Sequence, residues 1–236
     1  MFTKSAHLYD LIYSAVGKDY AAEAAMVHAI IERYKCSSGN RLLDVACGSG
    51  QHLTHLAAFY EPAGLDLDEN LLAAARQRCP EVPFFHADMT DFNLGLRFDV
   101  ITCLFSSIGY VKILPRLNQT LRTFARHLAP GGVLLVEPWF APDTFYPGRV
   151  SAVFVDQPEL KVVRMSSTQV RGRLSTLYFY YMVGTPAGVE VFNERHDLGL
   201  FTHAEYRKAF QKAGLEVFYE ETGLTGRGLY IGRLAP

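Results

Sequence analysis

Residues 41–51 (Arg-Leu-Leu-Asp-Val-Ala-Cys-Gly-Ser-Gly-Gln) combine an acidic side chain with a turn made of small residues. The apolar first half is typical of a short buried strand with Asp44 near its carboxyl end, and a helix is expected to begin at the last residue. Ala46, Gly48 and Gly50 alternate through the turn, so a ligand can approach the backbone closely. The free N–H groups of the helix point into the same turn. The pattern predicts a pocket for a polar ligand at the end of a strand.

A second carboxylate, Asp66, ends the next apolar stretch, 16 residues beyond Gly50. This is close to the spacing at which α/β folds place an acid on a ribose diol, so a ribose-bearing cofactor is expected. A nicotinamide-dependent dehydrogenase is one alternative, but the third glycine of its fingerprint is missing and Asp44 would repel a pyrophosphate. S-adenosylmethionine carries an ammonium and a sulfonium and no phosphate, and therefore fits the two acids better.

Bulk properties narrow the class of protein. The chain has 236 residues, a net charge of −1 and 49% hydrophobic residues, which suits one large domain or one domain with an insertion. The charge gives no reason to expect binding to nucleic acid or to a membrane surface. The four cysteines and the scattered histidines show no metal-ligand spacing, so no metal is expected. With no long apolar run and no leader pattern, a cytoplasmic location is the expectation.

The pattern of apolar and polar residues changes after about residue 137. Before that point, short apolar segments alternate with helical patterns and predict a parallel sheet covered on both faces, with strands at 41–46, 61–66, 82–86, 98–104 and 133–137. Pro130-Gly131-Gly132 is expected to end the helix 114–128. From residue 150 to 200 no helical period remains, which indicates antiparallel strands. A helix capped by Thr202 and two closing strands are expected to complete the fold.

Four segments resemble, in order and spacing, the motifs of class I S-adenosylmethionine-dependent methyltransferases: 44–50, 64–66, 87–89 and 128–132. Five more resemble the TDP-aminosugar N,N-dimethyltransferases of macrolide biosynthesis, which finish desosamine and mycaminose: 17–20, 88–92, 105–110, 136–139 and 226–228. The resemblance implies a Rossmann-like sheet of seven mostly parallel strands, the last antiparallel, with an antiparallel β insertion. It also implies three parts: a helical segment and cofactor-binding core (1–137), an insertion over the substrate (138–200) and closing elements (201–236).

Carried over by position, the resemblance implies a set of cofactor contacts. Asp66 would hold the ribose hydroxyls, and Asp88 and Met89 would flank the adenine. The remaining cofactor-binding residues would surround the methionine and ribose: Tyr20, Asp44, Ala46, Gly48, Gly50, Phe105 and Ser106. Ser107 would face the reacting methyl and the substrate.

The resemblance also implies the acceptor, which would be the amino group of a TDP-linked deoxysugar. Tyr110 is the first candidate to orient this amine and Tyr13 the second. A tyrosine has a pKa near 10, so orientation is expected rather than proton abstraction. Arg227 would meet the diphosphate, with Trp139, Arg149 and Arg164 as weaker candidates in the same groove. A homodimer is one assembly compatible with the sequence.

Other interpretations stay open at this point. Tyr13 and Tyr20 also suit core aromatics, Tyr110 suits a rim position, and Arg227 suits a solvated turn. Asp66 could cap the following helix, although Asp68 is placed to do so. The chain could instead methylate another small-molecule nitrogen or oxygen acceptor, or bind the cofactor without turnover.

Overall fold

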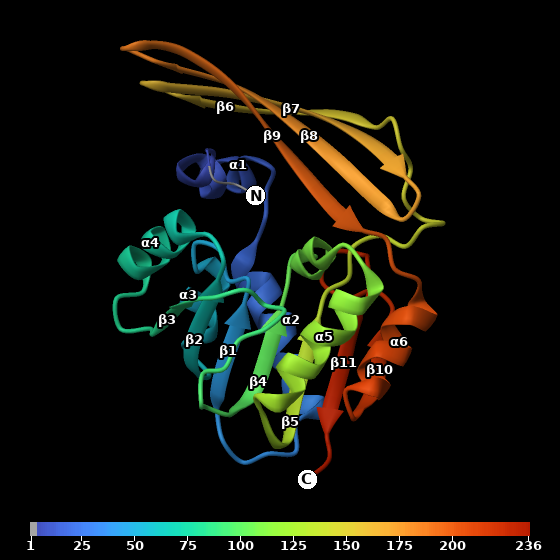
Figure 1. Cartoon of the computed structure of the whole chain (residues 1–236). Helices are drawn as coiled ribbons and strands as arrows, with labels where there is room; N and C mark the ends of the chain where they lie inside the picture. The colour runs from blue at the N-terminus through green and yellow to red at the C-terminus, as the bar shows by residue number, and fades with distance from the viewer. Residues whose placement is uncertain (1–3) are drawn as a thin grey trace.

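The computed structural model describes residues 4–236 and contains two sheets (Figure 1). The larger sheet has seven strands in the order β10-β11-β5-β4-β1-β2-β3, and the smaller has four in the order β6-β7-β8-β9. Of the seven strands in the larger sheet, β11 alone runs opposite to the rest, since it pairs antiparallel with both β5 and β10. The predicted seven-stranded, mostly parallel sheet with an antiparallel last strand and a β insertion is confirmed.

The larger sheet is built from the alternating apolar segments that the sequence shows. Its strands are β1 (Arg41–Val45), β2 (Glu61–Asp66), β3 (Phe84–His86), β4 (Phe98–Cys103), β5 (Leu128–Val136), β10 (Leu215–Glu220) and β11 (Leu229–Leu234). Every residue of β4 is buried, as expected for a central strand covered on both faces.

Helices cover both faces of this sheet. One core cluster packs below α2 (Tyr20–Tyr34), α3 (Gln51–Leu56) and α4 (Glu69–Arg78). The other packs below α5 (Leu114–Arg126) and α6 (His203–Lys212). Thr202 caps α6 in a capping box with Glu205, which confirms the predicted cap. None of the helices in residues 4–236 is both long and apolar enough to span a bilayer.

One boundary differs from the sequence prediction. Pro130-Gly131-Gly132 lies inside β5, which begins at Leu128, and does not separate the helix from the strand. The pairing of β5 with β4 shifts register between Phe98 and Val100, so this segment is an irregular part of the strand. A Cβ at Gly132 would lie 2.9 Å from two carbonyl oxygens, which explains why glycine stands there.

The smaller sheet lies over the edge at which the parallel strands end (Figure 1). Its strands are β6 (Val150–Gln157), β7 (Leu160–Arg171), β8 (Leu174–Thr185) and β9 (Gly188–Gly199). The N-terminal elements η1 (Ala6–Leu8) and α1 (Tyr9–Ala15) lie between the two sheets, and Leu8 and Ile12 join the core formed by the inner face of the smaller sheet. β9 contacts the short helix η2 (Ser107–Val111), which follows β4. The region between the sheets is therefore enclosed by three segments that are distant in sequence.

Candidate active site

A main cavity of about 260 Å³ opens where β1, β2, β3 and β4 end. Seven of the residues predicted from the sequence line it: Ala46, Gly48, Asp66, Asp88, Met89, Ser107 and Tyr110. They come from four separate strand ends, which meet because parallel strands finish at one edge of the sheet.

Asp66 joins two backbone segments beside the main cavity. Its Oδ2 accepts a hydrogen bond from the Gly48 N–H at 2.8 Å, and its Oδ1 accepts one from the Asp68 N–H at 2.8 Å. Burial raises the pKa of Asp66. Asp68, and not Asp66, caps α4 by accepting from the Asn70 and Leu71 N–H groups. The capping interpretation of Asp66 is therefore wrong, and its carboxylate faces the main cavity.

A side pocket of about 30 Å³ continues from the main cavity, sharing Tyr9, Ala46, Gly48 and Ser107 as walls. Three further predicted cofactor residues line it: Tyr20, Asp44 and Phe105. The Tyr20 hydroxyl is buried and has no hydrogen-bond partner among residues 4–236. A buried hydroxyl of this kind fits a ligand that carries its own polar groups.

Asp44 is 2% exposed and supplies negative charge to the side pocket. Its Oδ1 accepts a hydrogen bond from the Thr102 hydroxyl at 2.8 Å. Burial raises the pKa of Asp44 to about 6, against smaller lowering effects of His52 and of the Thr102 hydrogen bond, and Asp66 adds a still smaller increase. A nearby cation stabilises the charged form of a buried carboxylate, so Asp44 suits the positive groups of S-adenosylmethionine.

We expect the affinity for S-adenosylmethionine to fall when the pH drops below about 6. A proton and the cationic cofactor compete for Asp44, so binding near this pH releases protons, and well below it each pH unit costs up to about tenfold in affinity. Calorimetry at pH 7 and pH 5, in buffers with different heats of ionisation, measures both effects. The Asp44→Asn variant should lose most of this dependence. An affinity that stays constant over the range would contradict the assignment.

A buried ion cluster lies beside the same pocket, with Lys18 just before α2, Glu23 on α2 and His52 on α3. The Lys18 ammonium donates to both carboxylate oxygens of Glu23, at 2.6 and 2.7 Å, and His52 Nε2 lies 2.7 Å from the second oxygen. The ammonium also lies 4.0 Å from the centre of the Phe105 ring, within cation–π range. Lys18 and Glu23 were not predicted from the sequence as site residues.

The turn after β4 has a backbone that two side chains hold in place. Phe105 and Ser106 both have positive φ, 52° and 60°, which is uncommon for residues with a side chain. The Phe105 N–H donates to Glu137 Oε2 at 2.6 Å, and the Ser106 hydroxyl donates to the Pro138 carbonyl at 2.7 Å. Ser106 is 1% exposed and lines neither the main cavity nor the side pocket, so it fixes the turn, and its predicted cofactor contact stays a prediction.

Gly50 also lies outside both cavities. It is the N-cap of α3 with φ 78°, and a Cβ there would come within 3.3 Å of Ala75 on α4. This glycine allows the turn and the close packing of two helices, and its predicted place beside the cofactor stays a prediction.

A distal cavity of about 590 Å³ lies between the start of α6 and the segment after β5, and Trp139 and Arg227 line it. An Arg227 N–H donates to Glu137 Oε1 at 3.1 Å, and the guanidinium lies 5.9 Å from the Trp139 ring centre. Glu137 is completely buried, and its other oxygen holds Phe105. One carboxylate therefore connects the distal cavity with the turn beside the side pocket.

The other predicted residues lie apart from these cavities. Tyr13 packs against Phe105, with ring centres 4.8 Å apart, and the Arg164 guanidinium lies 5.3 Å from the Tyr13 ring centre. Arg164 is 9% exposed and comes from β7, so it packs α1 against the smaller sheet. Arg149 is exposed next to the start of β6, and the structure does not bring it to any of the three cavities.

Several residues of the site were missed by sequence reasoning. Tyr9 lines both the main cavity and the side pocket. Arg116 lines the main cavity and donates to Asp88 Oδ2 at 3.0 Å. His196 bonds to Tyr110 from β9. The aromatic run near Tyr9 was a usable signal, whereas no local pattern links His196 to Tyr110.

The fold and this site define a methyltransferase that uses S-adenosylmethionine, and residues 42–132 match the methyltransferase domain family. The chain is 43% identical over 229 residues to the dTDP-3-amino-3,6-dideoxy-alpha-D-glucopyranose N,N-dimethyltransferase of Streptomyces fradiae, covering 96% of this chain and 89% of that protein. The crystal structure of Streptomyces venezuelae DesVI matches with a TM-score of 0.92 and 42% identity over 98% of each chain.

A third comparison is CalS10, an amino pentose methyltransferase of Micromonospora echinaspora involved in calicheamicin biosynthesis, solved with S-adenosylmethionine bound. It matches with a TM-score of 0.87 and 37% identity over 96% of each chain. The chain belongs to the family of dTDP-aminosugar N,N-dimethyltransferases.

Proposed function

We propose that this chain methylates the amino group of a dTDP-linked aminodeoxysugar. Family membership over nearly the whole chain, including the smaller sheet, is the observation that carries this proposal. Three relatives are named as N,N-dimethyltransferases of such sugars, so we expect two successive methyl transfers to one nitrogen.

The main cavity and side pocket are proposed to hold S-adenosylmethionine. Asp66 would accept from the ribose hydroxyls, Asp88 and Met89 would flank the adenine, and Asp44 and Tyr20 would meet the polar groups of the methionine end. When bound, the cofactor supplies a methyl group that its sulfonium already activates.

The chain's own task is then to position the amine. Tyr110 lines the main cavity together with Ser107 and Asp66, so its hydroxyl oxygen is proposed to accept a hydrogen bond from the substrate N–H. Holding the nitrogen and the methyl in line at about 3 Å supplies a large part of the rate enhancement of such a displacement. Burial raises the pKa of Tyr110 well above its usual value, so a phenolate base is not expected near neutral pH.

The distal cavity is proposed to receive the nucleotide diphosphate. Arg227 is held there by Glu137 and lies near the Trp139 ring, so a planar donor group is fixed beside aromatic surface. Tyr13, Arg164 and Arg149 lie outside the three cavities, so their predicted roles toward the amine and the substrate groove stay predictions.

Calorimetric titration with S-adenosylhomocysteine, followed by dTDP in its presence, tests the proposal. Binding of both ligands, then conversion of a dTDP-linked aminosugar to mono- and dimethylated products by mass spectrometry, is the expected result. Binding of S-adenosylhomocysteine without any binding of dTDP would contradict the proposed substrate. It would direct the search to other small-molecule nitrogen or oxygen acceptors.

A further inference from the structure

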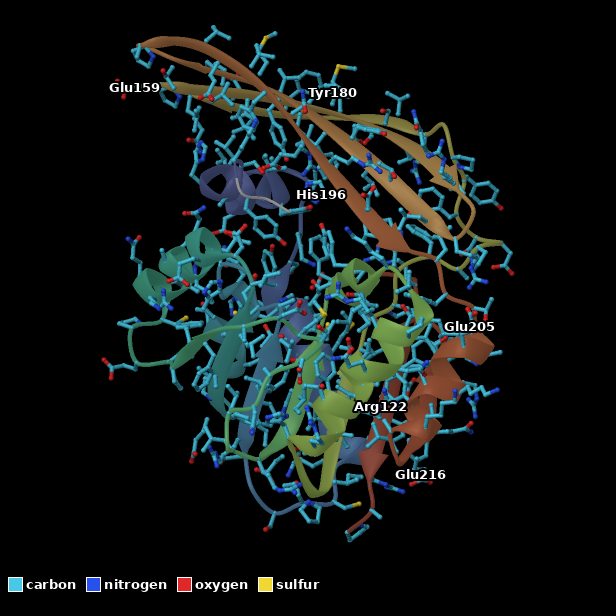
Figure 2. All side chains as sticks on the ribbon, viewed as in Figure 1. Arg122, Glu159, Tyr180, His196, Glu205 and Glu216 are labelled. Atoms are coloured by element: carbon cyan, nitrogen blue, oxygen red, sulfur yellow. The ribbon has the colours of Figure 1, made fainter. Side chains whose placement is uncertain are left out.

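A hydrogen bond connects the main cavity to the smaller sheet. The Tyr110 hydroxyl, on η2, lies 2.7 Å from His196 Nδ1. His196 lies on β9, in the smaller sheet (Figure 2). His196 is 1% exposed, whereas Tyr110 is only partly buried and lines the main cavity. A residue that is 86 positions away in sequence therefore sets the environment of the hydroxyl that is proposed to face the substrate.

The group behind the imidazole is a carboxylate. Glu194 lies two residues before His196 on the same face of β9, and its Oε2 is 3.6 Å from His196 Nε2. It accepts from the Lys4 N–H at 2.8 Å, the Ser5 N–H at 3.1 Å and the Ser5 hydroxyl at 2.6 Å. Burial alone would raise the pKa of Glu194, but His196 and these donors lower it to about 2. Glu194 is therefore an anion at neutral pH.

This anion decides which imidazole nitrogen carries the proton. Burial lowers the pKa of His196, so the ring is neutral at pH 7 and holds one N–H. The carboxylate beside Nε2 favours a proton on Nε2, because a bare nitrogen there would face oxygen lone pairs. Nδ1 is then an acceptor, and the Tyr110 hydroxyl donates its proton to Nδ1. The lone pairs of the Tyr110 oxygen remain available to the main cavity.

We propose that His196 is a positioning residue for methyl transfer: by binding the Tyr110 proton, it makes the Tyr110 oxygen an acceptor toward the substrate amine. A freely rotating hydroxyl could donate to the nitrogen lone pair and so occupy the electrons that must attack the methyl. A hydroxyl that already donates to His196 Nδ1 can only accept a hydrogen bond from the amine N–H, and it leaves the nitrogen lone pair free. Primary and monomethylated amines both carry such an N–H, so the same contact serves two rounds. This inference rests on the proposed function.

Replacing His196 with leucine tests the inference. The His196→Leu variant should lower kcat by about 10- to 100-fold, while KM and the affinity for S-adenosylhomocysteine change less than about twofold, since misplacement of a reacting group costs up to about 10²-fold. The His196→Asn variant should keep most of the wild-type kcat, because the Asn Oδ1 can accept a hydrogen bond near the position of Nδ1. His28→Leu is a matched control. The Nδ1 of His28, on α2, lies 2.8 Å from the Tyr60 hydroxyl, so this variant also removes a histidine partner of a tyrosine. It should leave kcat unchanged.

A double-mutant cycle separates positioning from general damage to the fold. In the Tyr110→Phe background, adding His196→Leu should change kcat less than twofold, because His196 acts only through the Tyr110 hydroxyl. If the two single losses multiply in the double variant, the inference is overturned. Should the leucine variant fail to fold, the same cycle is run with His196→Phe, which also removes the Nδ1 acceptor and keeps a ring of similar size. An unchanged kcat in a folded His196→Leu enzyme also overturns it.

Nitrogen-15 NMR of histidine-labelled protein reads the tautomer without turnover. The His196 signal, assigned by its absence in His196→Asn, should show an unprotonated Nδ1 whose shift changes in Tyr110→Phe. A protonated Nδ1 overturns the positioning inference by itself. A wild-type enzyme that converts no dTDP-linked amine refutes the proposed function instead, so the two failures are distinguishable.

Discussion

The Asp66→Ala variant is expected to lose at least about 100-fold in affinity for S-adenosylmethionine and S-adenosylhomocysteine. In the proposed complex the carboxylate accepts from two ribose hydroxyls, and hydrogen bonds to a charged group contribute about 1.5–3 kcal/mol each. The variant also frees the Gly48 and Asp68 N–H groups, which the carboxylate holds at 2.8 Å beside the main cavity. Both effects weaken binding, and calorimetry with S-adenosylhomocysteine measures their sum.

Asp99→Ala provides a matched control for this measurement. Asp99 has the same 7% exposure as Asp66, and its Oδ2 accepts from the Arg41 N–H at 3.1 Å. It lies at the start of β4, at the opposite edge of the sheet from the cavities. Its replacement should lower the melting temperature without changing the affinity for the cofactor. If Asp66→Ala binds S-adenosylhomocysteine like the wild type, the ribose assignment is wrong.

The Arg227→Ala variant is expected to raise KM for a dTDP-linked substrate by about 100-fold and to change kcat much less. A charge-assisted contact to the diphosphate is present in both the bound substrate and the transition state, so its loss appears in KM. Initial rates over a range of substrate concentrations, at saturating S-adenosylmethionine, give both parameters. A phosphate-free aminosugar should show no comparable change in KM.

The partner of Arg227 requires a second variant. Removing the arginine leaves the buried Glu137 carboxylate without its positive neighbour, which could disturb the Phe105 turn that Glu137 also holds. Arg227→Ala combined with Glu137→Gln removes this unpaired charge. If the single and double variants show the same increase in KM, the loss belongs to the diphosphate contact. If the double variant recovers the wild-type KM, Arg227 serves only to neutralise Glu137.

Elements whose formation depends on residues close together in the sequence could be predicted from the sequence. The strand, small-residue turn and helix around Asp44 have local patterns, and the acid at Asp66 lies at a fixed offset from them. Burial periodicity and turn residues act over a few positions, so the positions of the strands in the cofactor half and the cap at Thr202 followed from local rules. The run Pro130-Gly131-Gly132 misled this reasoning, because sheet pairing overrode its usual role as a helix stop.

Only the tertiary structure decided how distant segments complete the site. His196 reaches Tyr110 across 86 residues because the smaller sheet lies over the ends of the central strands. Arg227 reaches Glu137 across 90 residues because the start of β11 pairs with the end of β5. Local secondary-structure propensity gives no information about such pairs, because their contact depends on how the two sheets and the helices pack together. The sequence by itself therefore determined the class of cofactor and the core fold, while packing determined the partners that orient Tyr110 and hold Arg227.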